Sequence, residues 1–420
     1  MPGIAHGTLR CGAADATPES IVLLTQGELA RLATRPAGVI LVDAAHYAHP
    51  TLRLLSQGIT SVLIGSAAAQ VLRPRTTVLL EGHTGRILLS PPQQRPVYRP
   101  PAPPSPGEPV LTRDAVAIEL RCSVTDARGA AAALAAGAAA IGLTRSEYLY
   151  PEDGRQPDAA FLTKACAAVC AAAHPLAVTF RLIDIAGDKR PPWLPELPGL
   201  GGTLGLQGAR LYGVEPVRSV YLAQLAALAT LQDRHRLRIL LPYLVAPEEL
   251  ERLHTEIRYL VSGTMPIGSM LETPAAALAV REFLELADFA ALGMNDLMQC
   301  LFAADRYRPE LCGYLDPYSP IIYRFLREVA GLAGADLERV QVNGLLAQLP
   351  GVLPALIGLG YRAYSVDPVM LPWLAQRVRK TDTVAAIALA EAVCAARRSS
   401  EVKRMLLSSE ASISSMRLSS

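Results

Sequence analysis

The sequence predicts an α/β protein, with a C-terminal (β/α)8 barrel of the TIM type preceded by a small α/β domain. After residue 113, short apolar runs alternate repeatedly with alanine- and leucine-rich helical segments, which is typical of βα units. A proline-dense stretch at 91–112 divides the chain, because proline removes backbone donors and favours extended structure. Polar residues that suit catalysis follow several of the apolar runs.

The composition indicates a globular protein rather than a disordered one. Of the 420 residues, 51% are hydrophobic and 19% are charged, and the formal net charge is +2. So small a charge gives no reason to expect nucleic acid or an anionic membrane as a partner. The apolar run 131–143 is too short to span a membrane, and the N-terminus lacks the apolar core of a signal peptide. The cysteines are scattered, as is usual in a reducing compartment. We therefore expect a cytoplasmic protein.

The first domain is predicted over residues 1–90. Two strands are expected at 38–45 and 60–67, and a hairpin at 76–90 with its turn at 82–85. A helix is expected between the first two strands, since Pro50 suits the first helical position and Gly58 suits the position beyond the end.

The barrel is predicted over residues 113–397, with eight candidate strands. They are AVAIELRC (115–122), AAAIGLTR (138–145), AVTFRLID (177–184), GARLY (208–212), RILLPYL (238–244), PIGSMLE (266–272), DFAALGM (288–294) and VQVNG (340–344). The last of these is taken as the final strand of the barrel. The serine-rich tail, 398–420, is predicted to be disordered.

Catalysis in a TIM barrel takes place at the carboxyl ends of its strands, and charged and polar residues gather at the predicted ends here. They are Arg145, Arg181, Asp184, Asp188, Lys189, Glu272, Asn295, Asp296 and, further on, Arg306. The carboxylates Glu272 and Asp296 suit Mg²⁺, which prefers hard oxygen ligands and keeps positions for water and substrate. The arginines and the lysine suit phosphate and carboxylate. The predicted ligand is a small, doubly anionic molecule that chelates Mg²⁺.

Several of these segments match known sequence blocks in order. They are IGLTRSEYLY (141–150), FRLIDIAGDK (180–189), IGSMLETPAAAL (267–278), FAALGMNDLMQCLFAADR (289–306) and GYLDPYSP (313–320). They resemble the phosphoenolpyruvate-utilising enzymes, which include enzyme I of the sugar phosphotransferase system, pyruvate phosphate dikinase and phosphoenolpyruvate synthase.

The resemblance implies a role for each matching residue. Arg145 and Arg181 are expected to bind the phosphoryl group and the substrate, with Lys189 nearby. Glu272 and Asp296 are expected to hold Mg²⁺. Asn295 and Arg306 are expected to contact the substrate, which is phosphoenolpyruvate or pyruvate. Members of the family dimerise through the barrel, so a homodimer is also implied.

The sequence departs from the family at two places in the barrel. The family's last strand ends in a CGE motif whose cysteine protonates the enolate of pyruvate, and this chain has Asn343, Gly344 and Leu345 there. A carboxamide is a poor proton donor to carbon. The family's LGxRxxR block reads LGLQGAR, so Gln207 replaces one phosphate-binding arginine while Arg210 remains. We expect ordinary turnover to pyruvate to be impaired while ligand and metal still bind.

The small domain resembles the family's swivelling phosphohistidine domain. The matching stretch, DAAHYAHPTLRLL (43–55), contains two candidate histidines but lacks the glycines and the serine of the family pattern. His49 is favoured because it precedes Pro50, at a helix start where free N–H groups can hold a phosphate, and His46 stays an alternative. The first 90 residues have no room for a carrier-docking or ATP-grasp domain, so the phosphoryl acceptor is expected to be another molecule, such as another protein.

Three functions remain open from the sequence. The first is a phosphotransferase in which Mg²⁺-bound phosphoenolpyruvate donates its phosphoryl group to His49. The second is an accessory or regulatory protein that binds phosphoenolpyruvate or pyruvate without turning it over. The third is a lyase or aldolase on the same barrel, in which loss of the proton donor protects a Mg²⁺-bound enolate.

Overall fold

The computed structural model describes residues 3–43, 54, 58–82, 85–89, 91, 101–187, 190–197, 199–200, 202, 204–261 and 265–415. The chain divides into two compact units. The N-terminal unit comprises Met1–Ala102 together with Phe302–Asp316, and the barrel unit comprises Pro103–Leu301 together with Pro317–Ser420.

The N-terminal unit is built on a six-stranded sheet with the order β4-β3-β2-β1-β5-β6. The strands are β1 (Ile4–Cys11), β2 (Ser20–Thr25), β3 (Gly38–Val42), β4 (Thr60–Ile64), β5 (Thr77–Glu81) and β6 (Arg86–Leu88). β1 to β4 run parallel, whereas β5 pairs antiparallel with β1 and β6, so the predicted hairpin is confirmed. Its short helices are η1 (Ala13–Asp15), η2 (Gln26–Arg31), α2 (Ser66–Ala69) and η6 (Pro309–Tyr314). The helix expected after Pro50 lies outside the described residues.

The barrel unit contains eight parallel strands that close on themselves, because β15 pairs with β8. They are β8 (Ala117–Val124), β9 (Ile141–Arg145), β10 (Val178–Arg181), β11 (Leu237–Leu244), β12 (Ile267–Leu271), β13 (Phe289–Gly293), β14 (Val340–Asn343) and β15 (Ala363–Val366). A short strand, β7 (Val110–Leu111), pairs antiparallel with β8. The predicted TIM-type barrel is confirmed.

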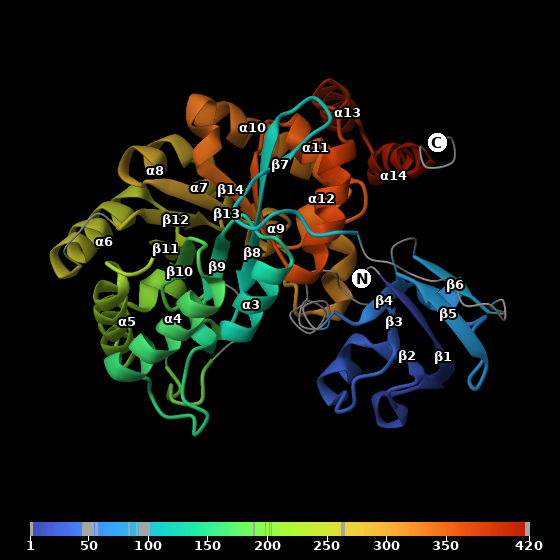
Figure 1. Ribbon diagram of the computed structural model, residues 1–420, viewed down its shortest axis with the longest axis horizontal. Coiled ribbons are helices and arrows are strands. Elements are labelled where there is room, and N and C mark those ends of the chain that lie inside the picture. Colours follow the sequence, from blue (N-terminus) through green and yellow to red (C-terminus); the bar gives the residue numbers. More distant parts are fainter. Residues whose placement is uncertain are drawn as a thin grey trace. The chain divides into compact units, whose positions relative to one another are not determined.

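Helices surround the barrel strands (Figure 1). They are α3 (Ala127–Ala135), α4 (Ala159–Ala173), α5 (Val217–Leu231), α6 (Pro247–Leu260), α7 (Pro274–Leu278), α8 (Val280–Leu286), α9 (Met294–Leu301), α10 (Pro320–Ala333), α11 (Val352–Gly358), α12 (Leu371–Lys380), α13 (Thr383–Ala395) and α14 (Ser399–Ser415). Side chains cap several N-termini; Asp126, for example, accepts a hydrogen bond from the Gly129 N–H at 2.7 Å. None of the helices in the described ranges is both long and apolar enough to cross a membrane.

Two predicted strands need correction. The segment 208–212 is not a strand but a 3₁₀ turn, η5 (Gly208–Leu211), because Gly208 has φ +54°, which an extended strand excludes. Its apolar residues are buried in loop packing instead. The eighth strand is β15, so VQVNG forms the seventh strand and not the last.

The predicted disordered tail is also wrong for most of its length. Residues Ser399–Ser415 form α14, which packs against α13, and Val402 and Leu406 are completely buried. A Cβ on Gly351, just before α11, would lie 2.4 Å from the Leu406 carbonyl oxygen, so α14 also lies directly on this loop. The helix is therefore part of the folded barrel unit.

Replacing Leu406 by alanine is expected to destabilise the protein by about 2–5 kcal/mol, because it removes a fully buried side chain and leaves a cavity. Leu407 is 39% exposed on the same helix, and its replacement by alanine is expected to change the free energy of unfolding by less than about 0.5 kcal/mol. Urea unfolding followed by circular dichroism measures both. Equal effects of the two substitutions would contradict the packing of α14.

Candidate functional site

The carboxyl ends of the barrel strands bring most of the predicted site residues to one mouth. Arg145, Arg181 and Asn343 are the last residues of β9, β10 and β14. Glu272 directly follows β12, and Asn295 and Asp296 lie in the first turn of α9, directly after β13. Because the strands are parallel and the sheet is closed, all these positions ring the same opening.

Arg181 is the centre of a buried group of charges and is only 4% exposed. Its Nη2 forms ion pairs with Glu147, from η3 (Ser146–Tyr148), and with Asp184 at 2.7 Å. Its Nη1 lies 3.9 Å from Glu272 Oε1. Burial alone would lower the pKa of Arg181, but Asp184, Glu147, Glu272 and Asp296 together raise this pKa well above its ordinary value.

The carboxylate of Glu272 is held in a fixed position. It is 2% exposed, and its Oε2 accepts a hydrogen bond from the Tyr243 N–H at 3.0 Å. A Cβ on Gly293, the last residue of β13, would lie 2.5 Å from Glu272 Cγ and 2.7 Å from Oε1. Glycine at this position therefore lets the glutamate lie across the end of β13, where α9 begins and carries Asp296.

The carboxylates of Glu272 and Asp296 are oxygen ligands of the type that Mg²⁺ prefers. Glu272 and Asp296 both raise the pKa of Arg181 and of the Cys300 thiol, so the two carboxylates share one neighbourhood. Throughout the described ranges, no group of three or more histidine, cysteine, aspartate or glutamate residues could hold a metal ion. Two carboxylate ligands with water and substrate completing the shell is the arrangement that Mg²⁺ commonly adopts.

Asn343 faces the barrel interior and is 2% exposed. Gln341, two residues earlier on β14, donates from Nε2 to the Gly142 carbonyl across the barrel, and side chains alternate along a strand. Within the described part of the chain, neither Oδ1 nor Nδ2 of Asn343 has a hydrogen-bond partner. A buried carboxamide with both polar atoms unpaired costs stability, which indicates a site that a polar ligand completes.

The loop after Asn343 depends on a glycine. Gly344 has φ +104°, and a Cβ there would lie 2.8 Å from Asn295 Oδ1. That same oxygen accepts a hydrogen bond from the Leu345 N–H at 3.2 Å. Asn295 therefore holds the β14 loop against the start of α9, whatever else it contacts.

Arg145 and Arg210 are the more accessible cations of the mouth. Arg210, on η5, is exposed, and its guanidinium lies 5.2 Å from the centroid of the Tyr243 ring. Its Nη1 donates to the Gly205 carbonyl at 3.3 Å. Since the Tyr243 N–H holds Glu272, Arg210 lies on the Glu272 side of the mouth.

Five of the predicted site residues lie outside the described part of the barrel unit. His46, His49, Asp188 and Lys189 lie outside the described residues. Arg306 belongs to the N-terminal unit, where its guanidinium lies 5.0 Å from the Tyr307 ring centroid. Their predicted roles stay predictions.

The structure also adds residues that sequence reasoning missed. Glu147 pairs with Arg181, and Tyr243 positions Glu272 through its backbone. Asp367 directly follows β15. The rule that strand ends carry chemistry would have found Asp367 if β15 had been recognised.

Comparison with known proteins gives consistent matches. Residues 105–383 match the family described as "PEP-utilising enzyme, PEP-binding domain". A phosphoenolpyruvate-protein phosphotransferase of Haloferax volcanii is 28% identical over 398 residues, covering 91% of this chain and 70% of that protein. A multiphosphoryl transfer protein of Xanthomonas campestris is 30% identical over 387 residues, covering 86% of this chain and 46% of the relative.

Other relatives are much longer than this chain. Multiphosphoryl transfer protein 1 of Escherichia coli is 27% identical over 305 residues, which cover 70% of this chain and 36% of that protein. The chain thus spans about a third of the length of this relative.

Replacing Arg181 by alanine is expected to destabilise the barrel by about 3–5 kcal/mol, because Glu147 and Asp184 would remain buried without their partner. Arg155, whose side chain is 69% exposed in its ion pair with Asp153, is the matched control. Its replacement by alanine is expected to cost less than about 0.5 kcal/mol. Urea unfolding measures both, and a small effect at Arg181 would contradict its central role.

Proposed function

Because the chain belongs to the phosphoenolpyruvate-utilising enzymes through their PEP-binding domain, we propose that its barrel binds phosphoenolpyruvate with Mg²⁺ and passes the phosphoryl group to a histidine. One observation carries this proposal. Glu272 lies over Gly293 towards α9, which bears Asp296, and both carboxylates act on the buried Arg181. Such a site suits a small anion that shares a divalent ion with the protein.

The cations of the mouth would bind the two acidic groups of the substrate. Arg145 and Arg210 are accessible guanidinium groups, and guanidinium binds phosphate and carboxylate through paired hydrogen bonds. Arg181 is engaged by Glu147 and Asp184, but its Nε has no hydrogen-bond partner among the described residues. This N–H group is therefore the part of Arg181 that is left for the ligand.

Glu272 and Asp296 would hold the magnesium ion, which when bound neutralises part of the charge on the phosphoryl oxygens. In the transfer step, the bond from phosphorus to the enol oxygen breaks and a bond to a ring nitrogen of His49 forms. The arginines stabilise the charge that the moving group spreads over its oxygens. The product left in the barrel is the enolate of pyruvate.

A second candidate function is binding without turnover, and Asn343 is the observation that favours it. Its unpaired carboxamide can donate and accept hydrogen bonds, but it has no proton to give to carbon near neutral pH. A barrel of this kind would serve as a sensor or accessory subunit. The third function considered from the sequence, a lyase or aldolase, would require a second substrate with a carbonyl group when it works in the condensation direction.

Incubation with phosphoenolpyruvate labelled with phosphorus-32, in the presence of Mg²⁺, tests the transfer. We expect acid-labile label on the protein, lost in His49→Ala and retained in His46→Ala. The reverse pattern would assign the label to His46. No label on any histidine, with Mg²⁺-dependent oxalate binding still seen by calorimetry, would replace the phosphotransferase by the binding function.

Replacing Asn343 by leucine, a side chain of similar branched shape, is expected to affect stability and binding in opposite directions. The ligand-free protein should gain about 1–2 kcal/mol of unfolding free energy, because a buried unpaired amide is removed. Oxalate affinity should fall about fivefold to tenfold, because the ligand loses a hydrogen bond. Thermal unfolding and calorimetry measure the two effects, and a loss of both would indicate that Asn343 is merely structural.

A further inference from the structure

A carboxyl group that the scheme above does not use lies at the end of β15. Asp367 directly follows this strand in extended conformation, with φ −69° and ψ 137°. Ser365, two residues earlier, faces the barrel interior, where its Oγ lies 2.9 Å from Ser123 Oγ of β8. Because strand side chains alternate, Asp367 lies on the same side as Ser365, one step nearer the mouth.

Asp367 is connected to the loop that carries Asn343. Ser365 is the register partner of Asn343 in the pairing of β15 with β14. Gln348, on η8 (Leu346–Gln348), donates from Nε2 to the Gly344 carbonyl at 3.1 Å and accepts from the Asp367 N–H at 3.4 Å. A side-chain hydrogen bond from Gln348 also reaches the Asp367 carboxyl. One glutamine therefore joins the end of β15 to the residue that follows Asn343.

The surroundings of Asp367 favour its protonated form. Burial of the carboxyl raises the pKa of Asp367 above the ordinary aspartate value, against the opposing effects of Arg145 and the Gln348 hydrogen bond. The Cys122 thiol on β8 is a further titratable group that interacts with Asp367, and burial and Asp367 both raise the pKa of this thiol. The residue is nevertheless partly exposed.

We propose that Asp367 is the proton donor of this barrel and protonates the enolate that Asn343 cannot protonate. The inference rests on the proposed function, since it requires enolpyruvate in the mouth. The O–H bond of the Asp367 carboxyl breaks while the carbon–carbon double bond of the enolate supplies the electron pair for a new C–H bond at the methylene carbon. The enolate oxygen re-forms the carbonyl of pyruvate, and the Asp367 carboxylate recovers a proton from water.

The Cys300 thiol is the alternative candidate for the proton donor. Cys300 lies on α9, and its Sγ is 3.9 Å from Oη of Tyr243, which lies on β11. Both groups lie beside the metal carboxylates, since Tyr243 donates its N–H to Glu272 and Cys300 is one helical turn beyond Asp296. Asp367 is instead beside the strand end at which the family acid is expected, which is why the geometry favours it.

The reverse step gives the test, because an Asp367 carboxylate would remove a methyl proton from pyruvate. We expect the protein with Mg²⁺ to exchange the methyl protons of pyruvate in deuterated buffer, as followed by NMR. Asp367→Asn should slow this exchange at least about 100-fold. Oxalate affinity, measured by calorimetry, should stay within about threefold, since oxalate needs no proton transfer.

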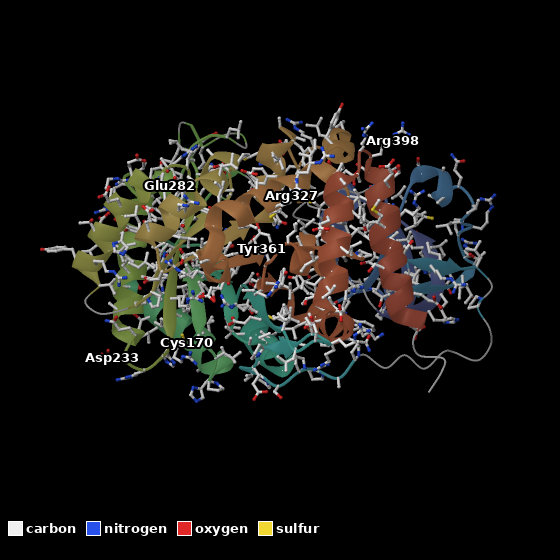
Figure 2. All side chains as sticks on the ribbon, turned by 90° about the horizontal axis from the view of Figure 1, so that it is seen from above. Cys170, Asp233, Glu282, Arg327, Tyr361 and Arg398 are labelled. Atoms are coloured by element: carbon white, nitrogen blue, oxygen red, sulfur yellow. The ribbon has the colours of Figure 1, made fainter. Side chains whose placement is uncertain are left out.

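Matched variants separate the proposed step from general damage. Asp233 is exposed at the outer edge of the barrel unit (Figure 2), and Asp233→Asn should leave both measurements unchanged. Adding Asn343→Cys to Asp367→Asn should restore part of the exchange, because it puts a thiol where the family has its acid. In the wild type, the exchange rate should rise with pH as Asp367 ionises, and in the double variant this rise should move to higher pH.

The outcomes distinguish this inference from the function on which it rests. If the wild type binds no oxalate with Mg²⁺, the proposed function fails and the proton donor fails with it. If oxalate binds but pyruvate shows no exchange, or if exchange persists in Asp367→Asn, the assignment of Asp367 is overturned while the binding function stands. Loss of exchange in Cys300→Ser, with Asp367→Asn unaffected, would transfer the role to Cys300.

Discussion

The mouth of the barrel depends on one buried arginine. Arg181 is the last residue of β10, and it gathers acids that follow three different strands: Glu147 after β9, Asp184 after β10 and Glu272 after β12. Acids so close to one another would repel without it, and a buried charge is tolerated only when it is paired. The arginine thus fixes the geometry of the carboxylates before any ligand arrives. Carboxylates that are preorganised in this way would lose little free energy to rearrangement on binding a ligand.

Glycines, which have no side chain, are as necessary to this geometry as the charged residues. Gly293 leaves the space that the Glu272 carboxylate fills, and Gly344 leaves the space for Asn295. Gly208, with φ +54°, brings η5 close enough that a Cβ would lie 2.7 Å from Tyr243 Cβ. The side chains of the mouth can therefore approach one another only because glycine stands at these three positions.

The sequence predicted the barrel and the half of its mouth that carries Glu272 and Asp296, because that half follows a simple rule. Strongly apolar strands such as β12 and β13 end abruptly in Glu272 and Asn295–Asp296. β15 was not predicted because it is short and carries the inward-facing Ser365, which interrupts its apolar pattern. The tail was misjudged from its serine content, although Val402 and Leu406 stand at the i, i+4 spacing of one helical face. Ion pairs such as Arg181–Glu147 depend on the barrel closing and cannot be read from spacing alone.

The two halves of the mouth differ in how closely their residues follow the family pattern. The half formed by β9 to β13 carries the residues that are proposed to bind metal and anion, whereas the half formed by β14 and β15 has Asn343 in place of the expected thiol and carries Asp367. Neighbouring strands lie about 4.8 Å apart, so an acid displaced by one strand still reaches the centre of a closed ring. A barrel mouth can tolerate such a shift because every strand end faces the same ligand. If Asp367 is the donor, the enolate is protonated from the end of β15 instead of the end of β14, and the hydrogen bonds of Gln348 to Gly344 and Asp367 connect these two strand ends.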